Sequence, residues 1–414
     1  MRIVVYPYHL EIGGSQLNAI ELAAAVRDLD HEVTVFGQPG ELCELIDSLG
    51  LPFVGSPRVG KRPTPSVMSA LCRLARDRSV DLVHGYEWPP ILEAAYGPGL
   101  RLGTATYATV MSMALVPFLP RQVPLVVGTE QIRRTALARQ HPGGAPVDLI
   151  EPPVDTRANA PDALTPDAAE KFRATAGLRP RDLNIVVICR LADELKLEGL
   201  LTAIDVVGQL ARQLPTPMRL VIVGDGPARA AVEQRAATAN AWLETPPVVL
   251  TGALLDPRPA YETADIMLGM GGSALRALAF AKPLVVQGEL GFWETLTPDN
   301  VEQFLDGGWY GLGDGAATGA ARLEAALRPL LADADLRARL GRYGRELVEA
   351  RFSLTHAAET QLALYQRALR DPRPRDLAGL VRGAGDMTRF RLARRYRQMR
   401  GTAVADHLAS PRPR

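Results

Sequence analysis

The sequence alternates short apolar runs with amphipathic stretches along most of its length, and this alternation restricts the fold more than any other feature. The runs Ile185–Cys189 and Arg219–Val223 are rich in β-branched residues, and each precedes a stretch with helical spacing of its apolar positions. Strands that alternate with helices form parallel sheets covered by helices. The chain is therefore predicted to be an α/β protein.

The size and composition of the chain exclude several classes of protein. With 414 residues and 47% hydrophobic content, the chain is long enough for two domains. A net charge of +1 argues against nucleic acid as a partner of the whole chain. The three cysteines, Cys43, Cys72 and Cys189, have neither disulfide nor metal-site spacing. No signal peptide or membrane span is recognisable, so a soluble, cytoplasmic protein is expected.

Two cations follow the strand at Ile185–Cys189. Arg190 ends that strand, and Lys196 stands at the entry to a long amphipathic helix. Open α/β sheets bind ligands at the carboxyl ends of their strands. The planar fork of arginine and the point charge of lysine both suit phosphate oxygens, so this pair is predicted to bind a diphosphate.

A glycine pair, Gly13 and Gly14, separates the first predicted strand from the first predicted helix. Glycines leave backbone room, and a helix start offers free N–H groups to an anion. The spacing Gly-x-Gly-x-x-Gly is absent, so no nicotinamide cofactor is predicted. Ligand contact and a simple tight turn between strand and helix are equally compatible with this pair.

A second glycine turn lies in the half of the chain that contains Arg190 and Lys196. Gly271, Gly272 and Ser273 precede the helix predicted at Ala274–Ala281, with Ser273 as its N-cap. The turn is interpreted as a phosphate cradle, in preference to an ordinary capped helix.

Polar and aromatic residues stand near other predicted strand ends. A strand is predicted at Val80–His84, so that His84 ends it and Glu87 follows, and Tyr107 ends another predicted strand. All three are candidates for the acceptor side of a site, although for His84 and Glu87 a loop packed by its own aromatic residues is the simpler interpretation. Glu289 follows a further strand and is either a ligand for sugar hydroxyls or an exposed loop carboxylate.

The end of the chain is strongly basic. Residues 370–414 hold twelve arginines and four aspartates, and a basic helix is predicted at Met387–Arg400. A solvated tail is preferred here, with peripheral contact to the inner membrane face or binding to a partner as the alternative.

Several motifs together resemble those of the family-4 glycosyltransferases. They are the pair Arg190 and Lys196, the sequence Val-Ile-Val-Gly-Asp-Gly-Pro at 221–227, the run Lys282–Val286, the sequence Gly-Gly-Ser-Gln at 13–16, and Val154-Asp155. The resemblance extends from Met1 to about Leu369. It implies the GT-B fold, in which two Rossmann-like parallel-sheet domains face each other across a cleft.

The resemblance also implies domain limits and a chemistry. The first domain, on the acceptor side, would comprise residues 1–165 with helix 356–370, the donor domain residues 166–355, and the basic tail residues 371–414. The second domain would hold a nucleotide-sugar donor, and Arg190 and Lys196 would stabilise the leaving diphosphate. Transfer would proceed with retention and without a metal or other cofactor, to a small-molecule or lipid-linked acceptor.

Two departures from the family pattern stand out. The positions of its paired glutamates hold Leu268 and Arg276, so Glu289 is hypothesised to replace the glutamate that contacts ribose. The family histidine in the first domain has no counterpart at Thr106-Tyr107, and no catalytic base is assigned. The alternatives are therefore a non-catalytic GT-B protein that binds a nucleotide-sugar or activates a partner, which the missing glutamates favour, and a sugar-nucleotide epimerase or phosphorylase.

Overall fold

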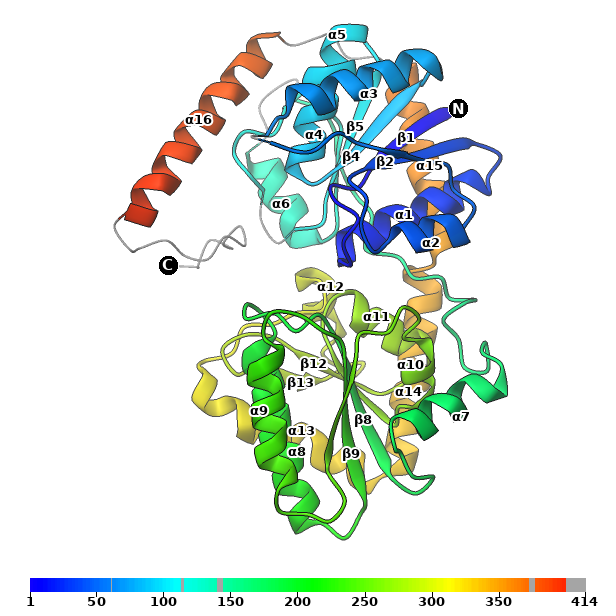
Figure 1. Ribbon diagram of the computed structural model, residues 1–414, viewed down its shortest axis with the longest axis vertical. Coiled ribbons are helices and arrows are strands. Elements are labelled where there is room, and N and C mark those ends of the chain that lie inside the picture. The colour runs from blue at the N-terminus through cyan, green and yellow to red at the C-terminus, as the bar shows by residue number, and fades with distance from the viewer. Residues whose placement is uncertain (61, 113–114, 140–143, 372–376, 400–414) are drawn as a thin grey trace. The chain divides into compact units, whose positions relative to one another are not determined.

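The computed structural model describes residues 1–60, 62–112, 115–139, 144–371 and 377–399, which divide into two compact units (Figure 1). The first unit comprises Met1–Pro153 and Leu354–Arg414, and the second comprises Val154–Ser353. The predicted boundary at 165/166 differs from this division. Val154 donates its N–H to Phe352 O at 2.8 Å and is buried in the second unit's core, so the chain changes units at Pro153.

Within the described residues, the first unit contains a parallel sheet of seven strands. In their order across the sheet they are β3 (Phe53–Gly55), β2 (Glu32–Gly37), β1 (Arg2–Tyr6), β4 (Leu82–Tyr86), β5 (Ala105–Val110), β6 (Leu125–Val127) and β7 (Val147–Leu149). Alternation along β1 fills both faces of this sheet: Ile3 and Val5 enter one apolar cluster, while Val4 and Tyr6 enter another. The sheet is thus buried on both sides.

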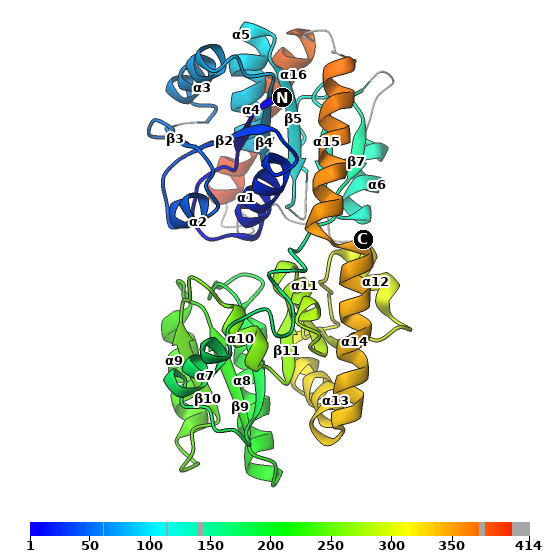
Figure 2. The ribbon, with the colours of Figure 1, turned by 90° about the vertical axis from the view of Figure 1, so that its right-hand side faces the viewer.

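Helices pack on both faces of the first sheet. The α-helices of this unit are α1 (Gly14–Arg27), α2 (Cys43–Ser48), α3 (Pro65–Asp77), α4 (Trp88–Ala94), α5 (Leu100–Leu102), α6 (Glu130–Ala138), α15 (Leu354–Arg370) and α16 (Leu377–Met399). Helix α15, distant in sequence, packs beside α1 and brings Ala357, Leu364 and Tyr365 into the core with Ile3 and Val5 (Figure 2). The predicted return of this helix to the first domain thus agrees with the grouping of residues by contact.

The second unit contains a six-stranded sheet within the described residues, with an antiparallel last strand. The order is β10 (Val248–Gly252), β9 (Met218–Val223), β8 (Leu183–Ile188), β11 (Ile266–Gly269), β12 (Leu284–Gln287) and β13 (Trp293–Thr295). Side chains of β8 again alternate: Ile185 and Val187 enter one apolar cluster, and Val186 enters the other.

The second sheet is also covered on both faces. The helices are α7 (Pro166–Thr175), α8 (Leu197–Gln213), α9 (Arg229–Asn240), α10 (Arg258–Thr263), α11 (Gly272–Ala279), α12 (Val301–Gly307), α13 (Gly319–Ala332) and α14 (Ala334–Arg351). Helices α8 and α9 pack on one face, with α11 and α14 on the other (Figure 1). The predicted α/β class with two parallel-sheet Rossmann-like domains is confirmed.

The basic tail differs from its prediction. Helix α16 starts at Leu377 rather than Met387, and Met387 and Phe390 pack against the first unit, so the preferred solvated tail is wrong for this stretch. Arg400 and the residues after it lie outside the described residues. Among the helices that the structure describes, none is long and apolar enough to cross a bilayer.

Candidate functional site

The loop between β8 and α8 carries both predicted cations at the carboxyl edge of the second sheet. Arg190 lies two residues beyond the end of β8 and is exposed, and Lys196 immediately precedes α8 and is partly buried. Burial lowers the pKa of Lys196, and the neighbouring Cys189 thiol opposes that shift. The two cations therefore share one loop at the edge where open α/β sheets bind ligands, as predicted.

Gly224, in the sequence Gly-Asp-Gly-Pro, lets this loop approach the end of β9 closely. Leu191 donates its N–H to Asp225 O at 2.9 Å, which ties the loop to the end of β9. A Cβ at Gly224 would overlap the carbonyl oxygen of Cys189, and Gly224 has φ +146°, which disfavours other residues. The close approach that positions Arg190 thus depends on glycine. Helix α9 then starts at Arg229.

The start of α11 differs in detail from its prediction. The helix begins at Gly272, its N-cap is Gly271 with φ +55°, and no side chain caps it. Ser273 lies inside the first turn and donates its hydroxyl to Met270 O at 2.9 Å, so the predicted N-cap role of Ser273 is wrong. Apart from neighbouring residues, no protein atom lies within 4 Å of a Cβ placed at Gly271. Ala274 donates its N–H to Gly271 O at 3.1 Å, so Gly272 and Ser273 supply the N–H groups that precede the first hydrogen bond of the helix.

Glu289, at the end of β12, is engaged within the protein. Its carboxylate accepts a hydrogen bond from the Tyr310 hydroxyl, and burial together with this carboxylate raises the pKa of Tyr310. Glu289 is partly buried, so the interpretation as a simple exposed carboxylate does not hold. Tyr310 fixes the orientation of the carboxylate and leaves further acceptor capacity on it.

The loops that carry Lys196, Glu289 and Gly271 interlock into one continuous edge. Gln287 donates to Lys196 O at 3.3 Å, and Glu198 accepts the N–H of Gly291 at 2.6 Å. Gly271 donates to Trp309 O at 2.9 Å, and Glu289 donates to Gly311 O at 3.1 Å, so the segment at 309–311 joins the other two loops. The structure thus brings these predicted donor residues to one side of the second unit.

The two positions at which the glutamate pair is missing lie in different surroundings. Leu268 is fully buried in β11. Arg276 lies in α11, with its guanidinium near Gly272: a Cβ on Gly272 would lie 3.6 Å from Arg276 Nη1. A cation therefore stands close to the open start of α11.

In the first unit, Glu87, just beyond the end of β4, connects the start of α1 with the segment that follows β5. Its carboxylate accepts the hydroxyl of Ser15 at 3.1 Å and the N–H of Met111 at 3.0 Å, and the Ser112 hydroxyl also donates to it. Ser15 follows the glycine pair Gly13 and Gly14, and no protein atom lies within 4 Å of a Cβ placed at Gly14. Glu87 and the first glycine turn are thus brought together at the carboxyl edge of this sheet.

The backbone of Glu87 is unusual. Its φ of 64° and ψ of 164° fall in a region that glycine adopts almost exclusively, at a cost of about 1–3 kcal/mol for other residues. Burial raises the pKa of the Glu87 carboxyl above its ordinary value, and the hydrogen bonds from Ser112, Met111 and Ser15 oppose the shift. A side chain retained in a strained conformation at a sheet edge is typical of a functional residue.

His84 and Tyr107 do not belong to this edge, which corrects their assignment to the acceptor side. Strand β4 continues to Tyr86, so His84 lies within the strand and is 0% exposed. Its ring nitrogens hydrogen-bond to Tyr365 Oη at 2.6 Å and Thr109 Oγ1 at 2.7 Å. Tyr107 is likewise 0% exposed, beside His84 in the core. Neither residue can contact an acceptor from this position.

Buried His84 should make stability depend on pH. Burial lowers its pKa to about 3, so the unfolded chain takes up a proton below pH 6.5 while the folded chain does not. Stability present above pH 6.5 is therefore lost as the pH falls towards 3, by about 2 kcal/mol at pH 5 from this group alone. Urea unfolding at pH 7 and pH 5 should show this difference reduced in His84→Gln and unchanged in His356→Gln, whose side chain is exposed. An unreduced difference in His84→Gln would show that His84 is not its source.

Sequence patterns missed several residues around the two edges. Glu93 is 0% exposed and binds Tyr6 Oη at 2.6 Å and Arg62 Nη1 at 3.2 Å, which fixes the segment after Arg62 against α4. Glu198 and Tyr310 were also missed. Glu198 alone carried a local signal, as an acidic residue in the first turn of a helix.

A cavity of about 390 Å³ in the first unit lies elsewhere. Its lining includes Asp81, Ala105 and Pro124, which are at the amino ends of β4, β5 and β6. It is therefore at the opposite edge of the sheet from Glu87. Among the residues that the structure describes, no three histidine, cysteine, aspartate or glutamate side chains are grouped so that they could hold a metal ion.

Comparisons with known proteins agree with this architecture. The chain has the GT-B fold. It resembles the glycosyltransferase of Rickettsia africae ESF-5 with a TM-score of 0.70 and 16% identity, covering 89% of this chain and 99% of that one. HepE of Anabaena, solved with UDP and glucose, gives a TM-score of 0.68 at 14% identity, covering 88% and 99% of the two chains.

Sequence comparison matches parts of the chain. Residues 182–306, which include Arg190, Lys196 and the start of α11, match the family described as glycosyl transferases group 1. Over 235 residues the chain is 34% identical to 2-deoxystreptamine glucosyltransferase of Streptomyces kanamyceticus. The matched segment covers 50% of this chain and 54% of the relative. The chain thus spans about half the length of the curated relative that it matches.

Proposed function

We propose that this protein is a glycosyltransferase that moves a sugar from a nucleotide-sugar to a small-molecule acceptor. The observation that carries the proposal is the shared loop of Arg190 and Lys196 at the carboxyl edge of the second sheet, beside the open start of α11. This edge lies within the segment that matches glycosyl transferases group 1. Two cations and free N–H groups suit a nucleoside diphosphate that departs during sugar transfer.

The donor is proposed to be a uridine nucleotide-sugar. HepE, which shares the fold, was solved in complexes with UDP and with UDP-glucose. Glu289, oriented by Tyr310, is proposed to accept hydrogen bonds from hydroxyls of the donor, in place of the missing glutamate. Arg190 and Lys196 are proposed to neutralise the departing diphosphate, as a metal ion does in other transferases, so that the reaction needs no metal.

The acceptor is proposed to bind at the edge of the first unit that contains Glu87. The carboxylate is held by Ser15 and Ser112, and the relative in Streptomyces kanamyceticus is named for glucosyl transfer to 2-deoxystreptamine, a cyclitol with two amino groups. An ionised carboxylate suits an ammonium group of such an acceptor. Transfer with retention, which the family-4 resemblance implies, completes the proposal.

The test is product analysis with UDP-glucose and 2-deoxystreptamine, with and without a chelator. The expected result is UDP release, a glucosylated product with the α-anomeric configuration of the donor, and the same rate in EDTA. A β-linked product would reject retention, and a rate abolished by EDTA would reject metal independence. Glu289→Ala is expected to weaken donor binding, and unchanged donor affinity would remove its assigned role.

A second candidate is a non-catalytic protein that binds a nucleotide-sugar. Leu268 and Arg276, at the positions of the paired glutamates, favour it. It predicts UDP binding without release of UDP from UDP-glucose across a panel of acceptors. A sugar-nucleotide epimerase would instead convert the donor to an isomer without any acceptor.

A further inference from the structure

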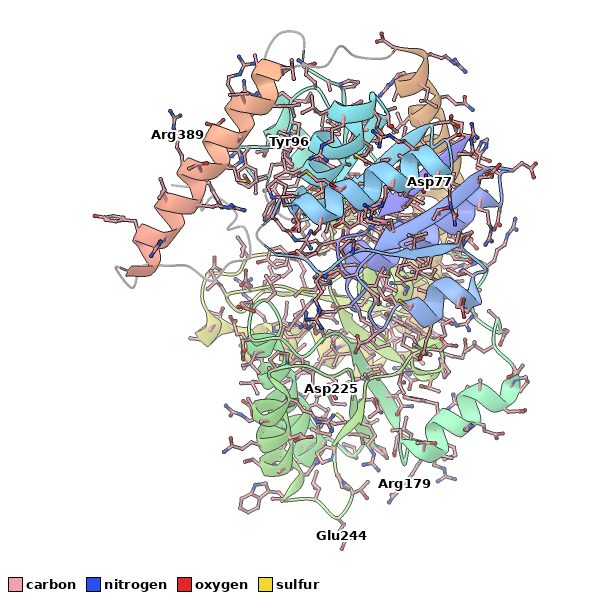
Figure 3. All side chains as sticks on the ribbon, turned by 45° about the horizontal axis from the view of Figure 1, so that its top comes forward. Asp77, Tyr96, Arg179, Asp225, Glu244 and Arg389 are labelled. Carbon is pink, nitrogen blue, oxygen red and sulfur yellow. The ribbon has the colours of Figure 1, made fainter. Side chains whose placement is uncertain are left out.

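Helix α16 has one side bound to the first unit. The Tyr96 hydroxyl donates to Leu380 O at 2.7 Å, and the rings of Phe118 and Phe390 pack edge to face with centroids 5.4 Å apart. Met387 joins the same apolar cluster. Figure 1 shows α16 along the outside of this unit, and Figure 3 labels Tyr96 and Arg389 there. The apolar residues on the inner side of α16 are therefore explained by their packing against the first unit.

The opposite side of α16 is also apolar, and it is exposed. Leu377, Val381, Leu392 and Tyr396 are 61%, 73%, 64% and 50% exposed. At 3.6 residues per turn these four fall within about a third of the helix circumference, opposite the packed side. An apolar stripe of this kind on a surface helix is not explained by the fold of the unit and marks an interaction site.

Arginines border the exposed stripe along both of its edges. By helical position, Arg382 and Arg389 lie on one flank and Arg395 on the other. Arg391 precedes Arg395 by one turn, but its guanidinium donates to Arg62 O of the first unit and so belongs to the packed side. Arg389 is 86% exposed, 3.7 Å from Asp386. Residues 377–399 contain six arginines and one acidic residue, Asp386. The exposed side of α16 is thus apolar at its centre and cationic at its margins.

The combination of an apolar stripe with flanking arginines fits some binding partners better than others. A second copy of α16 would bring arginine against arginine, with Asp386 as the sole carboxylate of each helix to offset the repulsion. Nucleic acid would leave the apolar stripe uncompensated. An anionic lipid surface satisfies both features, because the stripe enters the acyl boundary while the arginines meet lipid phosphates. We propose that α16 docks the protein on anionic membranes, lying in the plane of the interface.

The proposal is tested by sedimentation of the full-length protein with vesicles. Vesicles of phosphatidylcholine are compared with an equal mixture of phosphatidylcholine and phosphatidylglycerol, at low and high salt. The wild-type protein is expected to bind the anionic vesicles, with weaker binding at high salt. The double variant Arg389→Gln, Arg395→Gln should bind about 30-fold more weakly. Leu392→Glu should bind about tenfold more weakly or worse.

Matched controls separate docking from a general change of surface. Leu255 is 68% exposed in the second unit, and Leu255→Glu should bind like the wild type, as should Arg235→Gln. All substituted side chains are exposed, so folding should persist, and circular dichroism checks this. Absence of binding, equal binding by the α16 variants, or self-association of the wild type that Leu392→Glu abolishes would overturn the proposal. None of these outcomes depends on sugar transfer.

Discussion

Lys196→Ala and Arg190→Ala are each expected to lower kcat about 100- to 1000-fold, the usual effect of removing one group that stabilises developing charge. The physical reason is that the departing diphosphate would lose one of two cations on the loop between β8 and α8. Steady-state release of UDP from UDP-glucose measures the effect. Unchanged circular dichroism should show that both variants remain folded.

Exposed cations of the same unit provide matched controls. Lys171→Ala and Arg181→Ala remove exposed side chains away from this loop and should retain wild-type turnover. Burial lowers the pKa of Lys196, so the activity of the wild type should fall at a lower pH than the ordinary pKa of lysine would give. Lys196→Arg should lose less of its own activity over the same rise in pH, because arginine stays charged. Near wild-type turnover in both alanine variants would reject the assigned chemistry.

Glu87→Gly and Glu87→Ala are both expected to abolish most turnover, yet the glycine variant should be the more stable by about 1–3 kcal/mol. Both remove the carboxylate, so the difference between them reports the backbone at φ 64° and ψ 164°. Urea unfolding measures this difference. At Glu170, an exposed helical position, the order should be reversed, with glycine less stable by about 1 kcal/mol.

Two results would contradict this interpretation of Glu87. Equal stability of the two variants would mean that the backbone at this position is not strained. Wild-type turnover in both would mean that the carboxylate is not part of the site. Strain without loss of turnover would leave Glu87 as a structural residue that joins Ser15, Met111 and Ser112.

Much of the fold could be predicted because its signals are local. The runs Ile185–Cys189 and Arg219–Val223 predict strands. In the structure they correspond to β8 and β9, whose ends differ from the predicted ends by at most two residues. Burial on both faces makes such strands continuously apolar, which is a strong pattern. The loop that carries Arg190 and Lys196 could be predicted for the same reason, because it lies between a strand and a helix that each have a clear local pattern.

Other parts could not be predicted, because distant segments decide them. The strand that begins before His84 extends to Tyr86 through pairing with β5, and the ring of His84 then meets Tyr365 from α15. No local pattern signals a partner that far along the chain. Glu87 is tied to Ser15, in the first turn of α1, and to Ser112, in the loop after β5, and both are distant from it in the sequence. Ser273 resembled an N-cap, but its hydroxyl turns back to Met270 O.

Calorimetric titration with UDP tests most directly whether the edge of the second unit binds a nucleoside diphosphate. The wild type, Lys171→Ala and Arg181→Ala should bind UDP with the same Kd. Lys196→Ala and Arg190→Ala should each bind at least about tenfold more weakly, since each loses a charge-assisted contact to phosphate. Equal affinity across all five proteins, or no binding of UDP to the wild type, would contradict the assignment of this edge as the donor site.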